Sequence, residues 1–262
     1  MPFQLLVGIV WWDGTDRKDG RLRGCIEGDG KVKIYIIDIK DVEEKGILGE
    51  RMFAVVGRQR QEKVERHRFD RDKVRSLCAG ALICLGVMEW DEKERDFTLH
   101  RVVPEKVNWE MLSAFFEAQG KSVFCEYGSN GKPSLKDYPE IHFNVSHSGD
   151  YVVAVFDRQP VGIDIQEHRQ LKENMARRFL TAWELEQTAM QAEGENREEI
   201  LCRLWAVKES YIKLTGEGMK KSMKDFKVNR QSGRIENVQH EPVAEFVEKV
   251  WMDKYYISVC SF

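Results

Sequence analysis

The sequence lacks any long apolar run, and this absence excludes a membrane-spanning protein. Among its 262 residues the longest apolar runs, such as Tyr151 to Phe156, have the length of a strand, whereas a membrane helix needs about 20 apolar residues. The apolar segment Phe3 to Trp12 lacks the basic start and the small-residue cleavage site of a signal peptide. We therefore expect a cytoplasmic protein that makes no membrane contact.

Cysteine pairs with metal or redox spacing are also missing. No two of the six cysteines are arranged as Cys-x-x-Cys, and most have apolar neighbours. Because a chain of this length can build a core without crosslinks, we expect reduced core cysteines in place of a disulfide framework or a zinc site.

The sequence also lacks a large excess of either positive or negative charge. The 41 Lys and Arg nearly balance the 44 Asp and Glu, for a net charge of −3, which disfavours a nucleic-acid partner. The hydrophobic fraction of 42% is enough for a core and excludes a disordered chain. One run, from Arg58 to Arg75, holds eight Lys or Arg against four Asp or Glu, and a solvated helix face is its simplest interpretation.

The hydrophobic pattern predicts an α+β fold built from two comparable halves. We expect strands at Lys31–Ile39 and around Phe143–Val145, helices from about Lys63 to Val87, Asn108 to Ala118, Met175 to Phe179, from Thr181 onward and from about Glu198 to Leu214, and a last strand from Tyr255 to Phe262. The strands Tyr151–Phe156 and Val161–Ile165 are expected to pair as a hairpin. We divide the chain into an N-terminal extension over 1–30 with the composition of turns or a hairpin, a first half over 31–147 and a second half over 148–262.

Three segments place polar atoms where a structural element does not need them. In FNVSHSGD, a predicted strand leads into Ser146, His147 and Ser148 on a bend, and hydroxyl, imidazole and backbone donors on a bend suit a phosphate. The alternative is a strand end with ordinary turn residues.

In VGIDIQEH, Asp164 and Gln166 lie at i and i+2, so both project from one face of a strand and offer two oxygens to a hard cation. The alternative is an edge strand with a wet polar face. In LWAVKESYIK, Trp205, Glu209 and Lys213 share one face of a helix. Taken alone, the Glu209 and Lys213 spacing is typical of an exposed ion pair.

Together and in this order, FNVSHSG, VGIDI and LWAVKESYIK resemble the 4′-phosphopantetheinyl transferase superfamily, and specifically its monomeric, double-length surfactin-type branch. The resemblance covers the chain from about Lys31 to the C-terminus. It implies two similar α+β halves packed as a pseudo-dimer, with the site in the cleft between them. It also implies transfer of the phosphopantetheine arm of coenzyme A to a serine of an apo acyl or peptidyl carrier protein, with release of 3′,5′-ADP.

The resemblance also implies roles for individual residues. Asp164, Gln166 and Glu209 would hold Mg²⁺, and Glu209 would be the base, acting directly or through water. Lys213 would contact the transferred phosphate. The coenzyme A nucleotide would be contacted by Ser146, His147, Lys132, Arg75 and Ser76.

Two features depart from the family pattern. Gln166 replaces the usual glutamate, so one metal ligand is a neutral amide, and we expect weaker Mg²⁺ binding or an additional water ligand. Glu167 is adjacent but points to the opposite face of the strand, which makes it a poor substitute. Residues 1–30 have no family counterpart.

Three rival functions remain to be compared. A non-catalytic module that binds coenzyme A or a carrier protein would share the fold, but the joint presence of Asp164, Glu209, Lys213 and His147 argues against it. Interleaved acidic residues argue against nucleic-acid binding, and SHSGD is not the G-x-S-x-G elbow of a serine hydrolase. The physiological carrier, the pathway and tolerance for acyl-coenzyme A are left open.

Overall fold

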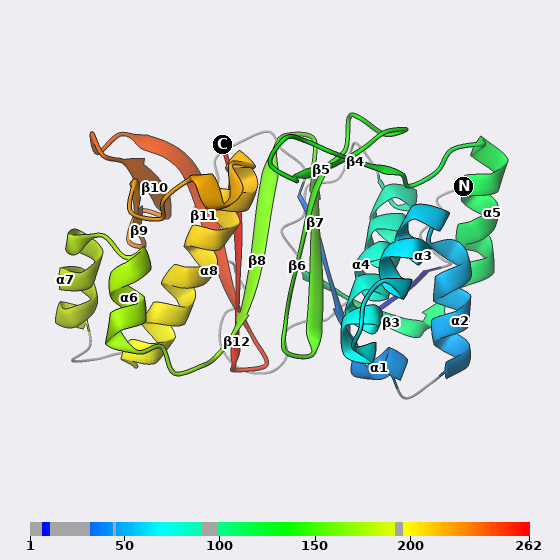
Figure 1. Cartoon of the computed structure of the whole chain (residues 1–262), viewed down its shortest axis with the longest axis horizontal. Helices are drawn as coiled ribbons and strands as arrows, with labels where there is room; N and C mark the ends of the chain where they lie inside the picture. The colour runs from blue at the N-terminus through cyan, green and yellow to red at the C-terminus, as the bar shows by residue number, and fades with distance from the viewer. Residues whose placement is uncertain (1–6, 11–31, 44–45, 91–98, 192–195) are drawn as a thin grey trace. The chain divides into compact units, whose positions relative to one another are not determined.

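The computed structural model describes residues 7–10, 32–43, 46–90, 99–191 and 196–262. These residues form a mixed α+β protein with two compact units (Figure 1). The first unit contains the described residues of 1–20, 30–128 and 133–158, and the second contains 129–132 and 159–262.

The first unit is built on one five-stranded sheet in the order β1-β3-β2-β7-β6, in which β2 and β3 are parallel and the other pairs antiparallel. Helix α4 packs on β2, β6 and β7, and α2, α3 and α5 contact α4 in turn. Its strands are β1 (Val7–Val10), β2 (Lys33–Asp38), β3 (Leu99–Val107), β4 (Cys125–Tyr127), β5 (Pro133–Leu135), β6 (His142–Ser148) and β7 (Tyr151–Asp157), with β4 and β5 forming a separate small hairpin. Its helices are α1 (Lys40–Glu43), α2 (Gly46–Val55), α3 (Arg58–Glu65), α4 (Asp70–Met88) and α5 (Trp109–Gln119).

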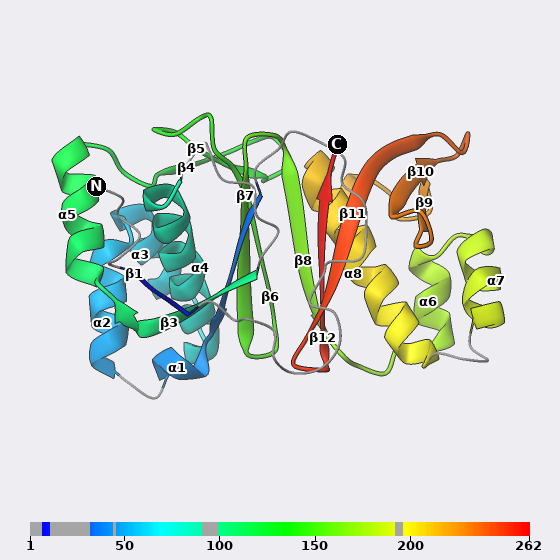
Figure 2. The ribbon, with the colours of Figure 1, turned by 180° about the vertical axis from the view of Figure 1, so that it is seen from behind.

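The second unit has an antiparallel sheet in the order β8-β12-β11-β10-β9. Helix α8 packs on β8 and β12, and α6 and α7 lie next to α8, as both views show (Figures 1 and 2). The strands are β8 (Val161–Glu167), β9 (Phe226–Asn229), β10 (Arg234–Asn237), β11 (Pro242–Trp251) and β12 (Tyr255–Ser261). The helices are α6 (Glu173–Phe179), α7 (Ala182–Gln191), α8 (Arg197–Thr215) and the 3₁₀ turn η2 (Gly218–Lys220).

Several helix boundaries are those that capping residues predict. Asn108 accepts a hydrogen bond from the Met111 amide at the start of α5, and Gly120 ends that helix in the left-handed conformation. At the start of α7, Thr181 and Glu184 form the predicted capping box, since each side chain accepts from the other residue's backbone N–H. The helices α6 and α8 and the strands β2 and β12 are also confirmed.

The predicted helix from Lys63 to Val87 is wrong as a single element. The structure has α3 and α4 instead, separated at Phe69, whose backbone is extended and whose side chain is 63% exposed. Asp70 and Asp72 in the first turn of α4 favour a new helix start here, because acidic groups interact favourably with a helix N-terminus.

The predicted hairpin of 151–156 with 161–165 is also wrong. Strand β7 pairs with β6 and β2, whereas β8 pairs with β12 in the other sheet. Because β6 and β7 are joined by a tight turn, the first unit extends to Arg158, beyond the predicted boundary between residues 147 and 148. Helices α1 and α2 and strands β9 to β11 had no prediction.

Some predictions concern the chain as a whole. Of the N-terminal extension, Val7–Val10 pairs with β3, and the remainder lies outside the described residues. The five described cysteines are free and buried, and Cys25 is not described. No helix in the described ranges is long and apolar enough to cross a membrane. The pseudo-dimer and the cleft stay predictions.

Candidate active site

Two of the predicted metal ligands lie on strand β8. Asp164 and Gln166 are both buried, and they face in the same direction as the strand alternation predicts. In the sheet, Asp164 lies opposite Ser258 of β12. Strand β8 lies at the edge of its sheet, as the alternative predicts, but the face that carries Asp164 and Gln166 is buried and not wet. Burial of a carboxylate is costly unless a cation or hydrogen bonds compensate it.

Helix α8 can approach β8 closely because residue 162 is glycine. A Cβ atom on Gly162 would lie 2.0 Å from the Ser210 carbonyl oxygen and 2.5 Å from the Leu214 nitrogen. Any side chain here would therefore push the helix backbone away from the strand. Gly162 thus sets the close packing that brings Glu209 and Lys213 of α8 to Asp164.

Lys213 pairs with Asp164 of β8 and not with Glu209, which lies one turn earlier on α8. Its Nζ lies 2.6 Å from Asp164 Oδ1 and donates a second hydrogen bond to the Ile163 carbonyl at 3.1 Å. The predicted alternative of an exposed Glu209–Lys213 pair is therefore not what forms. The cation instead neutralises the buried carboxylate of the strand.

Glu209 is half-buried and has a perturbed carboxyl group. Burial raises its pKa, the negative charge of Asp164 raises it further, and Lys213 partly opposes both effects. Among the described residues its carboxylate has no hydrogen bond or ion pair. A carboxylate that has no bonding partner of its own and lies near a second carboxylate is suited to bind a cation.

The donor set fits Mg²⁺. Asp164, Glu209 and the amide oxygen of Gln166 are hard oxygen ligands, which Mg²⁺ prefers. In the described ranges no three His, Cys, Asp and Glu side chains are placed to hold a metal ion. An ion held here would therefore have two carboxylates and the amide oxygen of Gln166 as candidate ligands, and water would fill the remaining positions.

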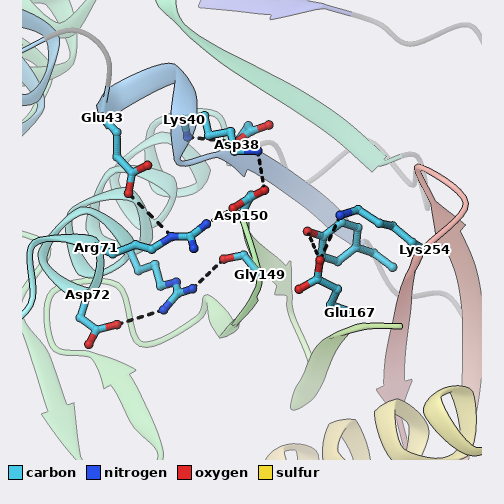
Figure 3. A network of polar contacts seen from close by, with 11 residues as sticks. Asp38, Lys40, Glu43, Arg71, Asp72, Gly149, Asp150, Glu167 and Lys254 are labelled. Carbon is cyan, nitrogen blue, oxygen red and sulfur yellow. Dashed lines mark hydrogen bonds and ion pairs between the residues drawn. The ribbon is translucent and has the colours of Figure 1, made fainter. Parts of the chain in front are cut away.

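Glu167 does not supply the missing third carboxylate. Its Oε1 accepts hydrogen bonds from Lys254 Nζ at 3.0 Å and from the Tyr255 hydroxyl at 3.1 Å (Figure 3). Meanwhile Gln166 Nε2 donates to the Glu167 carbonyl at 2.7 Å, which leaves the amide oxygen of Gln166 as its potential ligand atom.

Lys132 lies at the C-terminal end of α8. Its Nζ donates to the Leu214 carbonyl at 2.7 Å and to the Val161 carbonyl at 3.4 Å, so it satisfies a carbonyl group in the last turn of the helix. Burial lowers the pKa of Lys132 to about 8. This residue connects the end of α8 to the start of β8, a role that the sequence did not indicate.

In the first unit, Ser146 and His147 belong to strand β6. The sequence placed them on a bend, but they pair with Val153 and Val152 of β7, and the turn comes later at Gly149 and Asp150. Ser146 is buried and His147 is exposed, as expected for neighbours on opposite faces of a strand. Of the two side chains, the imidazole of His147 is the more exposed to solvent.

Basic side chains hold the turn after β6. Arg71 forms an ion pair with Asp150 and Lys40 forms another with it at 2.8 Å, while Arg75 Nη2 donates to the Gly149 carbonyl at 2.7 Å (Figure 3). The roles of Arg71 and Lys40 were missed, because no local sequence pattern links them to a turn so far along the chain.

Arg75 and Ser76, two of the predicted nucleotide contacts, each have one buried polar atom that makes no hydrogen bond. Neither Arg75 Nε nor Ser76 Oγ has a hydrogen-bond partner, although both atoms are buried. Unsatisfied buried donors are uncommon and need an explanation. They are two of eight such atoms among the described residues, and both belong to the second turn of α4.

Comparisons with known proteins identify the family of the chain. A model of the 4′-phosphopantetheinyl transferase superfamily matches residues 160–260. The chain is 32% identical over 197 residues to 4′-phosphopantetheinyl transferase psf-1 of Bacillus pumilus, which covers 74% of this chain and 73% of that protein. The chain belongs to this superfamily. Similar transferases of Bacillus subtilis are ffp, with 28% identity over 81% of this chain and 84% of ffp, and Sfp, with 37% identity over 40% of this chain and 47% of Sfp.

The matched segment contains the predicted site residues on β8 and α8. Asp164, Gln166, Glu209 and Lys213 all lie within 160–260, whereas the predicted nucleotide contacts on α4 and β6 precede it. The chain is thus a transferase whose family signature coincides with its cluster of two carboxylates and one lysine.

Proposed function

We propose that this transferase moves the 4′-phosphopantetheine arm of coenzyme A to a serine hydroxyl of an acyl or peptidyl carrier protein and releases 3′,5′-ADP. Family membership supports the reaction. The observation that supports the site most directly is Glu209, a half-buried carboxylate beside Asp164 and Lys213 with no bonding partner in the described chain.

We propose Asp164, Glu209 and Gln166 as the ligands of Mg²⁺. When bound, the ion would supply positive charge to the pyrophosphate oxygens. Phosphoryl transfer requires little covalent participation by the protein, so positioning and charge stabilisation provide most of the rate. Lys213 adds a second positive charge, which we assign to the phosphate that is transferred.

Glu209 is our candidate for the base that takes the proton of the carrier serine, directly or through a water. The effect of burial and of Asp164 on its pKa brings that value closer to neutral, where a carboxylate is a better proton acceptor. Asp164 then has two roles: it offers a ligand oxygen to the ion, and its negative charge raises the pKa of Glu209.

For the nucleotide we propose Arg75, Ser76, Ser146 and His147 in the first unit. Arg75 Nε and Ser76 Oγ are buried without partners in the second turn of α4, and an anion such as the 3′-phosphate would give both a partner there. Nucleotide contact by Lys132 stays a prediction. It would require this ammonium group to leave the carbonyls of Leu214 and Val161.

The experiment is to incubate the purified chain with an apo carrier protein, coenzyme A and Mg²⁺, and to measure the mass of the carrier. Transfer of the arm adds about 340 Da. A carrier whose modified serine is replaced by alanine is the matched control and should keep its mass. No mass increase across several carriers, together with retained binding of coenzyme A, would instead support the non-catalytic module.

A further inference from the structure

The ammonium group of Lys213 occupies a position beside a predicted metal ligand. Its Nζ lies 2.6 Å from Asp164 Oδ1 and 3.1 Å from the carbonyl oxygen of the adjacent Ile163. Both acceptors belong to β8, and the lysine reaches them from α8. A positive charge is therefore bound to the strand at Asp164.

This charge opposes a metal ion. Mg²⁺ that binds Asp164 must approach a carboxylate that already has a cation at contact distance, and two cations a few ångström apart repel strongly where water is partly excluded. The side chain of Lys213 is 26% exposed, and its four-carbon stem is flexible. Unlike a fully buried ammonium, it has solvent and substrate as other partners.

We propose that Lys213 is a resident counter-ion of Asp164, which competes with Mg²⁺ for this carboxylate and moves to the substrate phosphate when coenzyme A binds. The inference rests on the proposed function, because it takes Asp164 as a metal ligand. It adds a regulatory property: the metal and the anionic substrate assist each other's binding, since either one releases Lys213 from Asp164.

The coupling must be reciprocal. If coenzyme A raises the affinity for Mg²⁺, then Mg²⁺ raises the affinity for coenzyme A by the same factor. Removal of the ammonium group removes the competitor. Its loss should strengthen Mg²⁺ binding to the substrate-free protein and shrink the additional gain that coenzyme A gives.

The test is calorimetric titration of Mg²⁺ into the substrate-free protein, for the wild type and for Lys213→Met. Met keeps an unbranched apolar stem without the charge. We expect about tenfold tighter Mg²⁺ binding to Lys213→Met, and wild-type affinity in Lys213→Arg, whose guanidinium can still pair with Asp164. Equal or weaker Mg²⁺ binding by Lys213→Met would overturn the proposal.

The matched control is Lys132→Met. Lys132 also contacts both α8 and β8, but its ammonium group bonds only carbonyl oxygens among the described residues. Its replacement should change Mg²⁺ affinity by less than about threefold, and a change as large as that of Lys213→Met would show a general charge effect and overturn the proposal.

Circular dichroism of both variants in EDTA verifies folding. Failure of transfer with the expected Mg²⁺ affinities would overturn the proposed function alone.

Discussion

The ion pair between Lys208 and Glu184 provides the sharpest stability prediction. Lys208 is 0% exposed and Glu184 1%, and Lys208 Nζ lies 2.9 Å from Glu184 Oε1. The same Nζ donates to the carbonyls of Met223 at 2.7 Å and Phe226 at 3.0 Å. All three protons of the ammonium group therefore have an acceptor, and the pair joins α8 to α7 and β9.

Lys208→Met would leave three acceptors without their donor. Removing one partner of a buried ion pair costs about 3–5 kcal/mol, because the remaining charge stays buried without compensation. Glu184 cannot easily move to water, since its oxygens also accept hydrogen bonds from the amides of Thr181 and Val228. We therefore expect the second unit to lose about 3–5 kcal/mol of unfolding free energy.

Hydrogen exchange of the α8 and β9 amides measures this loss within the second unit. Lys221→Met is the matched control, because Lys221 also pairs with a glutamate, Glu217, but with exposed fractions of 20% and 48%. That variant should lose about 1 kcal/mol or less. The double variant Lys208→Met/Glu184→Leu should be less destabilised than the sum of its single variants. Additive losses, or a Lys208→Met loss as small as that of Lys221→Met, would refute the reasoning.

Three further predictions concern metal and pH. Gln166→Glu should lower the Mg²⁺ concentration for half-maximal transfer, and an unchanged requirement would exclude Gln166 as a ligand. In EDTA, the raised pKa of Glu209 means that the folded state keeps this proton to higher pH, so the contribution of Glu209 to the unfolding free energy should fall as pH rises above 4.5. The difference in unfolding free energy between wild type and Glu209→Gln should therefore change with pH in that direction, and a pH-independent difference would contradict the assignment. Burial lowers the pKa of Lys132 from 10.5 to about 8 in the folded state. Between these two pH values the unfolded state therefore binds more protons than the folded state. Urea unfolding should show stability rising with pH over that window, and a smaller rise in Lys132→Met.

Local patterns predicted the elements whose ends are fixed by nearby residues. The capping box of Thr181 and Glu184 and the glycine after α5 act within one helical turn, so the sequence contains all the partners. Phe69 shows the opposite case. Its position fits the apolar spacing of a helix, but its side chain is exposed and does not join the core. The helix is interrupted there.

Strand partners could not be read from the sequence. Both β7 and β8 are buried and apolar, and a short connection separates them, which is the pattern of a hairpin. The pairing of β7 with β2 and of β8 with β12 depends on contacts about one hundred residues apart along the chain. Local spacing contains no information about these partners.

The site was predicted in part for the same reason. Alternation along a strand placed Asp164 and Gln166 on one face, and the spacing of four placed Glu209 and Lys213 on one helix face. That Lys213 contacts Asp164 depends on the close approach of α8 at Gly162, which is a property of the packed unit.

The central claim is that the transfer implied by the family membership requires the carboxylate of Glu209. Its most direct test is the mass of a carrier protein after incubation with coenzyme A, Mg²⁺ and either Glu209→Gln or the control Glu186→Gln, a residue exposed on α7. We predict wild-type rates of modification with Glu186→Gln and a decrease of about 10²-fold or more with Glu209→Gln. Modification by Glu209→Gln at the rate of the control would contradict the account.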